Sequence, residues 1–194
     1  MKQQIQDIIN RLPKYEESLN KPMIIAISGF GGSGKSTRAQ DLQNHLSDSE
    51  IISIDDFIIN RLQKRSSDWE GFDRERFRVQ VLEPAIKRKT ISYDEYNWKE
   101  NKIIGNKKIT TQLKYIIVEG CSILHPDLTK YYDFSIWIDC PLDVATQRGL
   151  KRHQDWGLKH DYLWLNLWMP NERDFFDKYR PDKLASYVHK ESVD

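Results

Sequence analysis

The sequence predicts an α/β fold in which helices cover both faces of a central parallel sheet, giving three layers, α/β/α. Short apolar runs, typical of buried parallel strands, alternate with segments of helical periodicity. The 194 residues suit one domain with a sizeable core. A glycine-rich loop joins the first apolar run to the helical segment after it. Such a sheet binds ligands beyond the carboxyl ends of its strands.

The glycine-rich loop reads Gly-Phe-Gly-Gly-Ser-Gly-Lys-Ser over residues 29–36 and matches the phosphate-binding pattern G-x-x-x-x-G-K-[ST]. Residues 23–28 before it predict a buried strand, and residues 37–46 after it predict a helix. We therefore expect a P-loop NTPase fold, in which Lys35 reaches the β- and γ-phosphates of ATP and the Ser36 hydroxyl holds Mg²⁺. The expected nucleotide-binding residues are Gly29, Gly31, Gly32, Ser33, Gly34, Lys35, Ser36 and Thr37.

The rest of the chain divides into further helices and strands. Residues 2–19 predict an amphipathic helix that Pro13 kinks or ends. The other expected strands are 51–54, 90–98, 107–111, 114–118, 134–138 and a short one near 187–188. The other expected helices are 74–87, 142–153 and 171–179. We expect one kinase domain over residues 1–194, with an acceptor-binding insertion at about 60–112 and a lid at about 148–171.

Composition excludes several classes of protein. The 30 basic and 29 acidic residues give a net charge of +1, which does not support general binding to nucleic acid or membrane surfaces. No run approaches the ~18 apolar residues that span a bilayer, and the polar N-terminus is unlike a secretory signal. Cys121 and Cys140 are too few for a disulfide framework, so we expect a cytoplasmic protein. The composition is compatible with a homo-oligomer as well as with a monomer.

Acidic residues follow two of the expected strands at the sheet edge where the phosphate loop lies. Asp55 and Asp56 follow the strand at 51–54, and Glu119 follows the strand at 114–118. Phosphoryl transfer needs a cation held between phosphate and protein oxygens, and a group that orients the attacking hydroxyl. We expect Asp55 to orient or deprotonate the hydroxyl, and Ser36, Asp55 and Glu119 to serve the metal, directly or through water. The alternative for such acids is helix capping or a solvated charge.

Arg148 and Arg152 are spaced i, i+4 and therefore lie on one face of the helix at 142–153. A lid that meets the charge of the transferred phosphoryl group carries arginines of this kind, so both are candidate catalytic residues. A solvated basic helix is an equal alternative on spacing alone.

Aromatic and acidic residues between the second and third strands predict an acceptor pocket or, equally, the core of a small lobe. The residues in question are Trp69, Phe72, Asp73, Tyr93, Asp94, Tyr96 and Trp98. A later apolar cluster, Trp164 to Met169, indicates a lid hinge, a dimer contact or buried packing. The five histidines lack metal-ligand spacing.

From about Met23 to Val188 the chain resembles the uridine kinase and phosphoribulokinase group of P-loop kinases. The resemblance rests on the phosphate loop, on Ser53 to Phe57, on Phe72-Asp73, on Tyr93-Asp94, on Ile117 to Gly120, and on Ile138-Asp139 leading to Arg148 and Arg152. It implies that Asp55 is the base for the acceptor hydroxyl. It also implies that Phe72, Asp73 and Tyr93 hold a nucleoside and that Arg148 and Arg152 are lid arginines.

The chain departs from typical uridine kinases where the base is recognised. It reads Asp-Asp-Phe-Ile at 55–58 in place of Asp-Ser-Phe-Tyr, has Trp98 near a position where the family carries a base-reading His, and reads Trp-Gly-Leu-Lys at 156–159 near the family's Arg-Gly-Arg. The first departure is similar to nicotinamide riboside kinases. We therefore expect an ATP- and Mg²⁺-dependent kinase of a nucleoside-like small molecule. The alternatives are another acceptor (nicotinamide riboside, pantothenate or a sugar phosphate) and a nucleotide-dependent switch or ATPase.

Overall fold

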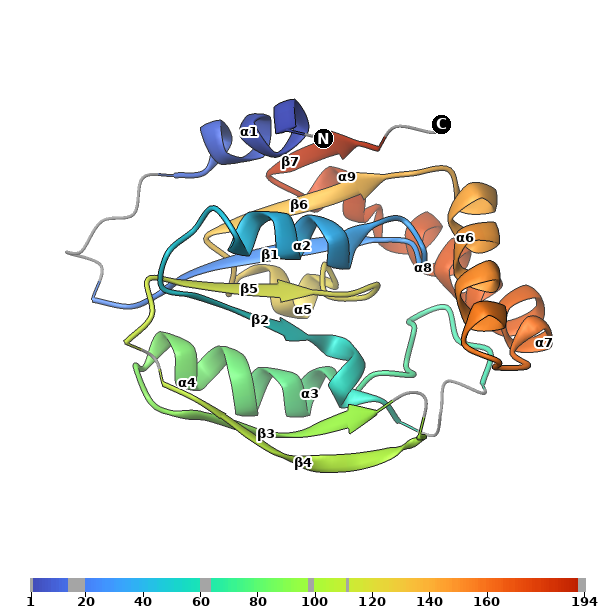
Figure 1. The fold of residues 1–194 in the computed structure, drawn as a ribbon, viewed down its shortest axis with the longest axis horizontal. Helices are drawn as coiled ribbons and strands as arrows, with labels where there is room; N and C mark the ends of the chain where they lie inside the picture. The colour runs from blue at the N-terminus through green and yellow to red at the C-terminus, as the bar shows by residue number, and fades with distance from the viewer. Residues whose placement is uncertain (1, 14–19, 60–63, 98–99, 111, 192–194) are drawn as a thin grey trace.

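A computed structural model describes residues 2–13, 20–59, 64–97, 100–110 and 112–191, and all structural statements below concern these residues. A five-stranded parallel sheet forms the centre, with strand order β2-β5-β1-β6-β7 (Figure 1). Its strands are β1 Met23–Gly29, β2 Ser49–Ser53, β5 Tyr115–Glu119, β6 Phe134–Asp139 and β7 Tyr187–Lys190. The predicted α/β fold with a parallel sheet is confirmed.

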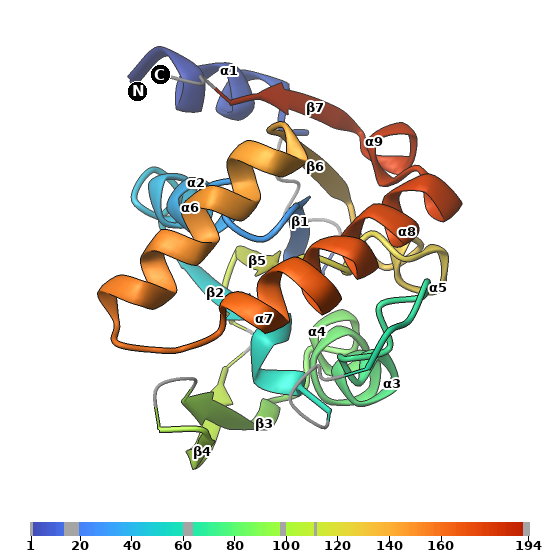
Figure 2. The ribbon, with the colours of Figure 1, turned by 90° about the vertical axis from the view of Figure 1, so that its right-hand side faces the viewer.

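Strand β1 shows why the sheet needs helices on both faces. All seven of its residues are buried, and alternate side chains enter two separate cores. Ile25 and Ile27 pack against α1 Lys2–Arg11 and α2 Lys35–Gln43 on one face. Ile24 and Ala26 belong to the core on the other face, which includes residues of α8 Met169–Tyr179. Figure 2 shows α2 and α8 on opposite sides of the sheet.

The carboxyl ends of the strands face the viewer in Figure 2, and the later helices lie across this end of the sheet. These are α6 Leu142–Asp155, α7 Asp161–Leu163, the π-helical turn η5 Trp164–Trp168 and α8. The helical run 161–179 is therefore longer than the predicted helix 171–179, because the apolar cluster at Trp164 to Met169 is itself helical. Two further short helices, α5 Pro126–Thr129 and α9 Pro181–Leu184, precede the strands β6 and β7.

Below the sheet in Figure 1 lies a smaller layer, built from one helical segment and an antiparallel hairpin. The segment is α3 Arg74–Phe77, the π-helical turn η4 Arg78–Leu82 and α4 Glu83–Ile86. Strand β3 Ile91–Asn97 pairs with β4 Lys102–Ile109. The strand predicted at 107–111 starts earlier, because β4 pairs with the full length of β3, from Ile91 opposite Ile109 to Asn97 opposite Lys102.

Other predicted boundaries shift by a few residues. Ile54 ends the strand β2 early, because it opens the 3₁₀ turn η2 Ile54–Phe57. The N-terminal helix ends at Arg11, and residues 14–19 of the predicted helix lie outside the described residues, as does Trp98. Among the helices that the structure describes, none has the length and apolar character needed to cross a membrane.

Candidate active site

The phosphate loop connects β1 to α2, as the sequence predicts, and it packs tightly against α6. Gly32 and Gly34 have φ angles of +85° and +96°, values that side chains rarely adopt. A Cβ atom on Gly32 would lie 2.1 Å from the carbonyl oxygen of Ala145 in α6. Glycine at position 32 therefore allows both the turn of the loop and the close approach of the helix that carries the two arginines.

Lys35 is a buried lysine within this loop. Its Nζ donates a hydrogen bond to the carbonyl oxygen of Phe30 at 2.8 Å. Burial works to lower the pKa of Lys35, but the acidic groups around it, including Glu119, Glu172 and Asp55, raise it above its ordinary value. The ammonium group is therefore kept charged at a position where phosphate charge would need neutralising.

Asp55 lies in the turn η2 directly after β2. The Ser53 hydroxyl caps the turn by accepting a hydrogen bond from the Asp55 N–H at 3.2 Å. A Cβ on Gly120 would lie 2.2 Å from Ile54 Cγ2, so glycine at position 120 lets this turn pack against the end of β5. Burial, with the charge of Glu119, raises the pKa of Asp55 to about 7, against the opposing effects of Lys35 and Arg152. A carboxyl group with that pKa is suited to accept a proton near neutral pH.

Ser36 and Glu119 bring two oxygen ligands together beside the loop. The Ser36 hydroxyl donates to Glu119 Oε2 at 3.3 Å, and Glu119 is buried at the end of β5. Among the described residues, no group of three or more His, Cys, Asp or Glu side chains is placed to hold a metal ion. Mg²⁺ is commonly bound by one or two protein oxygens together with phosphates and waters, so this donor pair fits Mg²⁺ held mainly by a nucleotide.

A cavity of about 400 Å³ follows the phosphate loop. The loop and the start of α2 line one side with Gly31, Gly32 and residues 34–37, whereas the predicted Gly29 and Ser33 are not in the lining. The side chains opposite are charged: Asp55, Glu119, Arg148, Arg152 and Glu191. We call it the phosphate cavity. The predicted arginines are thus on the face of α6 that meets the loop.

A second cavity, of about 210 Å³, adjoins the first, and we call it the acceptor cavity. Its apolar walls come from Trp69, Phe72, Trp156, Trp164 and Trp168. Its polar side chains include Asp55, Arg152, His153 and Glu172. Gly31, Ser36, Asp55, Cys121 and Arg152 line both cavities, so the two meet at Asp55.

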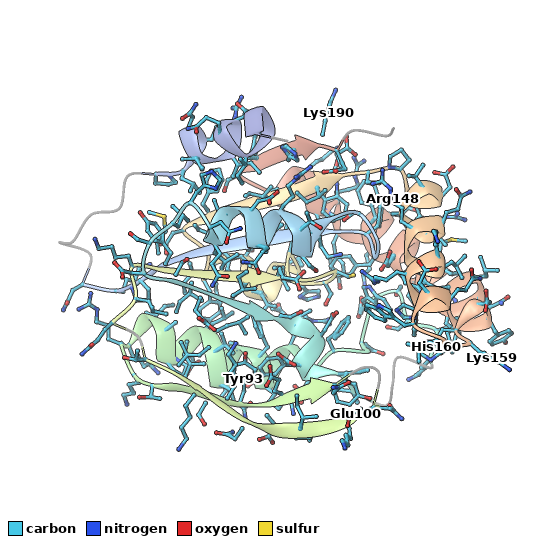
Figure 3. The ribbon with its side chains drawn as sticks, in the orientation of Figure 1. Tyr93, Glu100, Arg148, Lys159, His160 and Lys190 are labelled. Carbon is cyan, nitrogen blue, oxygen red and sulfur yellow. The ribbon has the colours of Figure 1, made fainter. Side chains whose placement is uncertain are left out.

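Of the predicted acceptor residues, the structure brings Asp55 and Phe72 to this cavity but not Asp73 or Tyr93. Asp73 Oδ1 accepts the Arg76 N–H at 2.8 Å and caps α3. Tyr93 is 1% exposed and packs in the core, its ring centroid 5.2 Å from that of Phe57. Figure 3 shows Tyr93 in the smaller layer beside β3, away from Arg148.

The hairpin acids and aromatics also have structural roles. Asp94 accepts a hydrogen bond from Asn106 across the hairpin at 3.2 Å. The Tyr96 N–H donates to Asp56 Oδ1 at 2.9 Å, so Asp56 faces the hairpin while its neighbour Asp55 faces the cavities. Trp98 lies outside the described residues.

Five cavity residues from the later helices are absent from the predicted site. They belong to α6, to the turn after it, or to the run η5–α8: His153, Trp156, Trp164, Trp168 and Glu172. The spacing of Trp164 and Trp168, i and i+4, indicated a shared helix face but not what it faced. The rings of Trp164 and Trp168 lie 5.2 Å apart and edge to face. Nothing in the local sequence separates Glu172 from the exposed acids near it.

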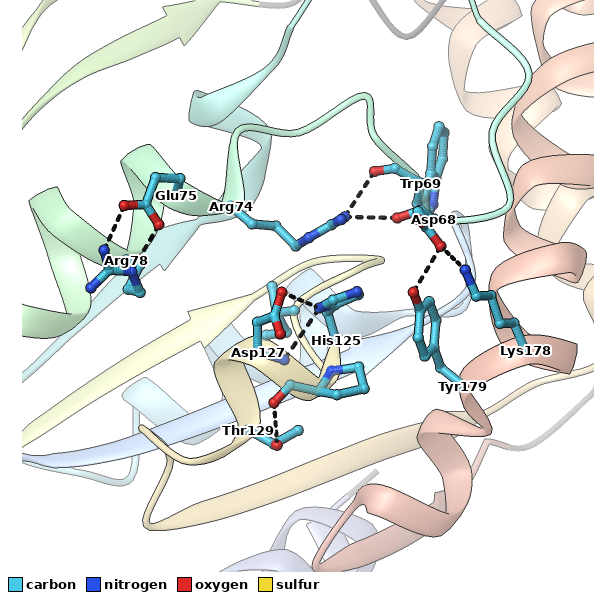
Figure 4. Close-up of polar contacts among 12 residues, drawn as sticks. Asp68, Trp69, Arg74, Glu75, Arg78, His125, Asp127, Thr129, Lys178 and Tyr179 are labelled. Carbon is cyan, nitrogen blue, oxygen red and sulfur yellow. Dashed lines mark hydrogen bonds and ion pairs between the residues drawn. The ribbon is translucent and has the colours of Figure 1, made fainter.

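Trp69 reaches the cavity from a segment that is held on both sides, as Figure 4 shows. Arg74 Nη1 donates to the carbonyl oxygens of Asp68 at 2.7 Å and Trp69 at 3.2 Å. From α8, Lys178 and Tyr179 both bind the Asp68 carboxylate, the latter at 2.7 Å. Trp69 itself has φ +53°, so these contacts hold it in a conformation that few non-glycine residues adopt.

A larger cavity of about 570 Å³ lies apart from the phosphate loop and includes Arg74, Arg78 and Lys130 in its lining. Arg78 is already paired with Glu75 and Glu83, and Arg74 is occupied by the Trp69 segment (Figure 4). Its size alone therefore does not make it the reaction site. Phe72 and Asp73 are in its lining, and it shares Phe72 with the acceptor cavity but no residue with the phosphate cavity.

The chain is similar to bacterial uridine kinases over about two thirds of its length. It is 31% identical to a uridine kinase of Clostridium novyi (strain NT), over 68% of each chain. It is 26% identical to a uridine kinase of Lactobacillus helveticus (strain DPC 4571), over 69% of each chain. No protein-family model matches the chain.

Solved structures share the whole fold. A kinase provisionally assigned to a fructose transport system in Silicibacter sp. TM1040 superposes with a TM-score of 0.76 at 25% identity, over 95% of this chain and 96% of the other. A possible uridine kinase from Bacillus stearothermophilus superposes with a TM-score of 0.71, over 96% and 97%. At 16% identity, the second likeness concerns the fold alone. With the phosphate loop and the relatives above, these likenesses establish that the chain belongs to the uridine kinase family of P-loop kinases.

Proposed function

We propose that the protein transfers the γ-phosphoryl group of ATP to a hydroxyl of a nucleoside or a similar small metabolite. The observation that carries this proposal is the position of Asp55, which lines the phosphate cavity and the acceptor cavity at once. A residue at this junction touches the hydroxyl and faces the phosphate that the hydroxyl attacks. The family membership supports a phosphotransferase with an alcohol acceptor.

In the proposed reaction, the acceptor oxygen forms a bond to the γ-phosphorus and the bond from that phosphorus to the bridging oxygen of ADP breaks. Asp55 orients the hydroxyl and takes its proton, which then passes to solvent. Lys35, Arg148 and Arg152 surround the phosphate cavity and meet the negative charge of the transferred group.

Mg²⁺ fits the oxygen donors at the loop, and we assign it to Ser36 and Glu119, with Asp55 close enough to contribute. When bound with the nucleotide, it supplies charge neutralisation between the phosphates. Glu119 in turn accepts the Ser36 hydroxyl, which fixes the orientation of that hydroxyl. Cys121 and Cys140 are both unpaired, which suits the reducing cytoplasm where we place the enzyme.

The test is an ADP-release assay with ATP and Mg²⁺ against a panel of hydroxyl compounds. Uridine, nicotinamide riboside and pantothenate belong in the panel. The likeness to a kinase assigned to a fructose transport system favours adding fructose and a sugar phosphate. ADP release that depends on one acceptor supports the proposal. Tight binding of Mg²⁺–ATP with nucleotide-dependent partner binding and no phosphorylated small product would instead indicate a switch.

The substitution Asp55→Asn tests the role given to this residue. We expect it to lower kcat by about 10²- to 10⁴-fold, the usual contribution of a positioned acid–base group. The affinity for ATP, measured by calorimetry, is expected to change little. Asp56→Asn is the matched control, because Asp56 faces the hairpin. Equal losses of transfer and of ATP binding in Asp55→Asn would make Asp55 a binding residue only.

A further inference from the structure

Glu172 is a buried acid held at the centre of the site. It is 4% exposed, and its two carboxylate oxygens each lie 2.9 Å from the N–H of Gly31 in the phosphate loop, 141 positions away in sequence. A Cβ on Gly31 would lie 2.9 Å from Glu172 Oε1, so glycine at position 31 permits this contact. Glu172 lines the acceptor cavity and is not among the residues that line the phosphate cavity.

The helix α8 is anchored at its first turn, which fixes Glu172. The neighbouring Asn171 is fully buried, and its side-chain oxygen accepts hydrogen bonds from Arg65 and from the Ser66 N–H, the latter at 2.9 Å. Its side-chain N–H donates to the carbonyl oxygen of Lys64 at 2.8 Å. Trp69 and Phe72 follow on the same segment. Consecutive residues of α8 therefore hold the phosphate loop and the aromatic wall of the acceptor cavity in place.

The Glu172 carboxylate retains unused hydrogen-bonding capacity. Burial raises the pKa of Glu172, and Lys35 and the Gly31 N–H oppose that rise. When ionised, its two oxygens have about four acceptor sites, and the Gly31 N–H and the Cys121 thiol take only part of them. Within the described residues no ion pair reaches Glu172, although Lys35 is near enough to influence it. A buried carboxylate with vacant acceptor sites beside a cavity is suited to receive hydroxyl donors.

Two tryptophans in the wall of the acceptor cavity have N–H groups without partners among the described residues. The indole N–H groups of Trp69 and Trp164 are buried, and neither has a hydrogen-bond partner in the described part of the chain. Both side chains line the cavity. Buried polar groups normally find a partner, so these two indoles leave unmet hydrogen-bonding capacity in the walls of the cavity.

We propose that Glu172 binds the hydroxyls of the acceptor that are not phosphorylated, and that the acceptor is a ring-bearing polyhydroxy compound without negative charge. This inference rests on the proposed kinase function. In the resemblance to uridine kinases the hydroxyl-binding role would belong to Asp73, but Asp73 caps α3 outside the cavity. Glu172 and Asp55 are the only carboxylates among the described residues lining the acceptor cavity.

The two carboxylates of the acceptor cavity, Asp55 and Glu172, determine which charge the acceptor can carry. Arg152 is the one lysine or arginine in the described lining, and it also lines the phosphate cavity, where γ-phosphate charge requires it. Its guanidinium lies 5.4 Å from the ring centre of Trp156. A carboxylate or phosphate on the acceptor would add a negative charge beside the buried Glu172 and the half-buried Asp55, at a cost in free energy that no spare cation offsets. Tryptophan rings accept a neutral or cationic ring readily.

The first experiment compares Glu172→Gln with Asp73→Asn. Glutamine keeps the size of the side chain and an oxygen for the Gly31 N–H, and asparagine remains a good helix cap. With uridine as probe, and with nicotinamide riboside as the alternative probe, we expect Glu172→Gln to raise the acceptor KM at least 10-fold. We expect the KM for ATP to change less than 3-fold, and Asp73→Asn to leave both values within 3-fold.

Two readouts separate binding of the acceptor from a structural role. Intrinsic tryptophan fluorescence reports acceptor binding without turnover, because four tryptophans line the cavity. Thermal unfolding shows whether Glu172→Gln remains folded, and Glu172→Asp provides a second, shorter carboxylate if it does not. An unchanged acceptor KM in Glu172→Gln, an equal rise in the KM for ATP, or a larger effect in Asp73→Asn would each overturn the assignment.

The second experiment sorts acceptors by charge. Uridine is neutral and nicotinamide riboside is cationic, whereas pantothenate and ribulose 5-phosphate are anionic. ADP release with a neutral or cationic compound and none with the anionic ones is the expected result. Release only with an anionic compound overturns the inference but leaves the kinase function intact. Release with none, together with no quenching of tryptophan fluorescence, removes the proposed function and the inference with it.

Discussion

Lys35 is the residue through which the phosphate loop neutralises the nucleotide in our proposal. We expect Lys35→Ala to lower kcat by at least about 10²-fold, because it removes a buried cation placed for phosphate charge. The fold should persist, because the acids around Lys35 can take up protons when the cation is lost. Circular dichroism and the ADP-release assay check both parts. Turnover at the wild-type level would contradict the assigned site.

At the scale of single residues, the phosphate loop and Asp55 could be predicted because local sequence determines them. A glycine-rich loop between a strand and a helix commonly binds phosphate. An acid that follows a parallel strand lies at the carboxyl end of the sheet, where ligands bind. The position of Asp73 could not be predicted, because the same Phe-Asp pair can send its carboxylate to a cavity or to a helix cap. Glu172 required knowledge of contacts 141 positions apart.

At the scale of elements, α6 offers an internal comparison among its basic residues. Arg148 lines the phosphate cavity and Arg152 lines both cavities, whereas Lys151 is exposed and paired with Asp155 at 3.1 Å. We expect Arg148→Ala to lower kcat/KM for ATP by roughly 10-fold or more. Arg152→Ala should also raise the acceptor KM, and Lys151→Ala should change each parameter less than about 2-fold. Steady-state kinetics on the three variants measures this.

A different outcome for α6 would favour the other interpretation of its spacing. If Lys151→Ala impaired turnover as much as the arginine variants, the basic residues would act as a general charged face. Spacing alone could not decide between these alternatives, because i, i+4 positions share a face without revealing what it meets. In the structure, glycine at position 32 permits α6 to pack against the loop, and Arg148 and Arg152 line the cavity there.

Longer elements show the same division between local and distant causes. The buried strands β1, β5 and β6 are predictable because their apolar runs have one plausible place in a parallel sheet. The hairpin strand β4 begins earlier than predicted because pairing with β3 extends it through polar residues. Pairing with a neighbour thus overrides the weak preference of residues such as Asn106 and Lys107.

For the whole molecule, buried histidines predict a loss of stability in acid. Burial lowers the pKa of His125, His189 and His160, and it lowers the pKa of His153 to about 4, assisted by Arg152 and His160. Each of these histidines is therefore protonated more readily in the unfolded chain as the pH falls below the ordinary histidine pKa of about 6.5, whereas the raised pKa values of Asp55 and Asp56 act in the opposite direction. The stabilisation that the neutral histidines contribute is complete above that pH and decreases progressively toward pH 4.

Urea unfolding at pH 7.5 and pH 5 measures this effect. His153 alone is expected to contribute up to about 3 kcal/mol of the total decrease across its range. His153→Gln should flatten part of the dependence, and His45→Gln, at an exposed position, serves as the control. The same pH dependence in His153→Gln as in the wild type would show that the fold does not keep His153 neutral.

Asn171 and Glu172 adjoin in one helical turn, and this adjacency bears on how the two substrates are recognised. Asn171 is hydrogen-bonded to the segment that carries Trp69, and Glu172 is hydrogen-bonded to the phosphate loop. Because the two residues are neighbours in one helical turn, a displacement of the turn that alters the contact of Asn171 also alters the contact of Glu172. Each substrate is therefore expected to change the affinity for its companion, and thermodynamic reciprocity makes the factor the same in both directions. The expected kinetic signature is a random-order scheme in which the dissociation constant of each substrate changes when the other is bound.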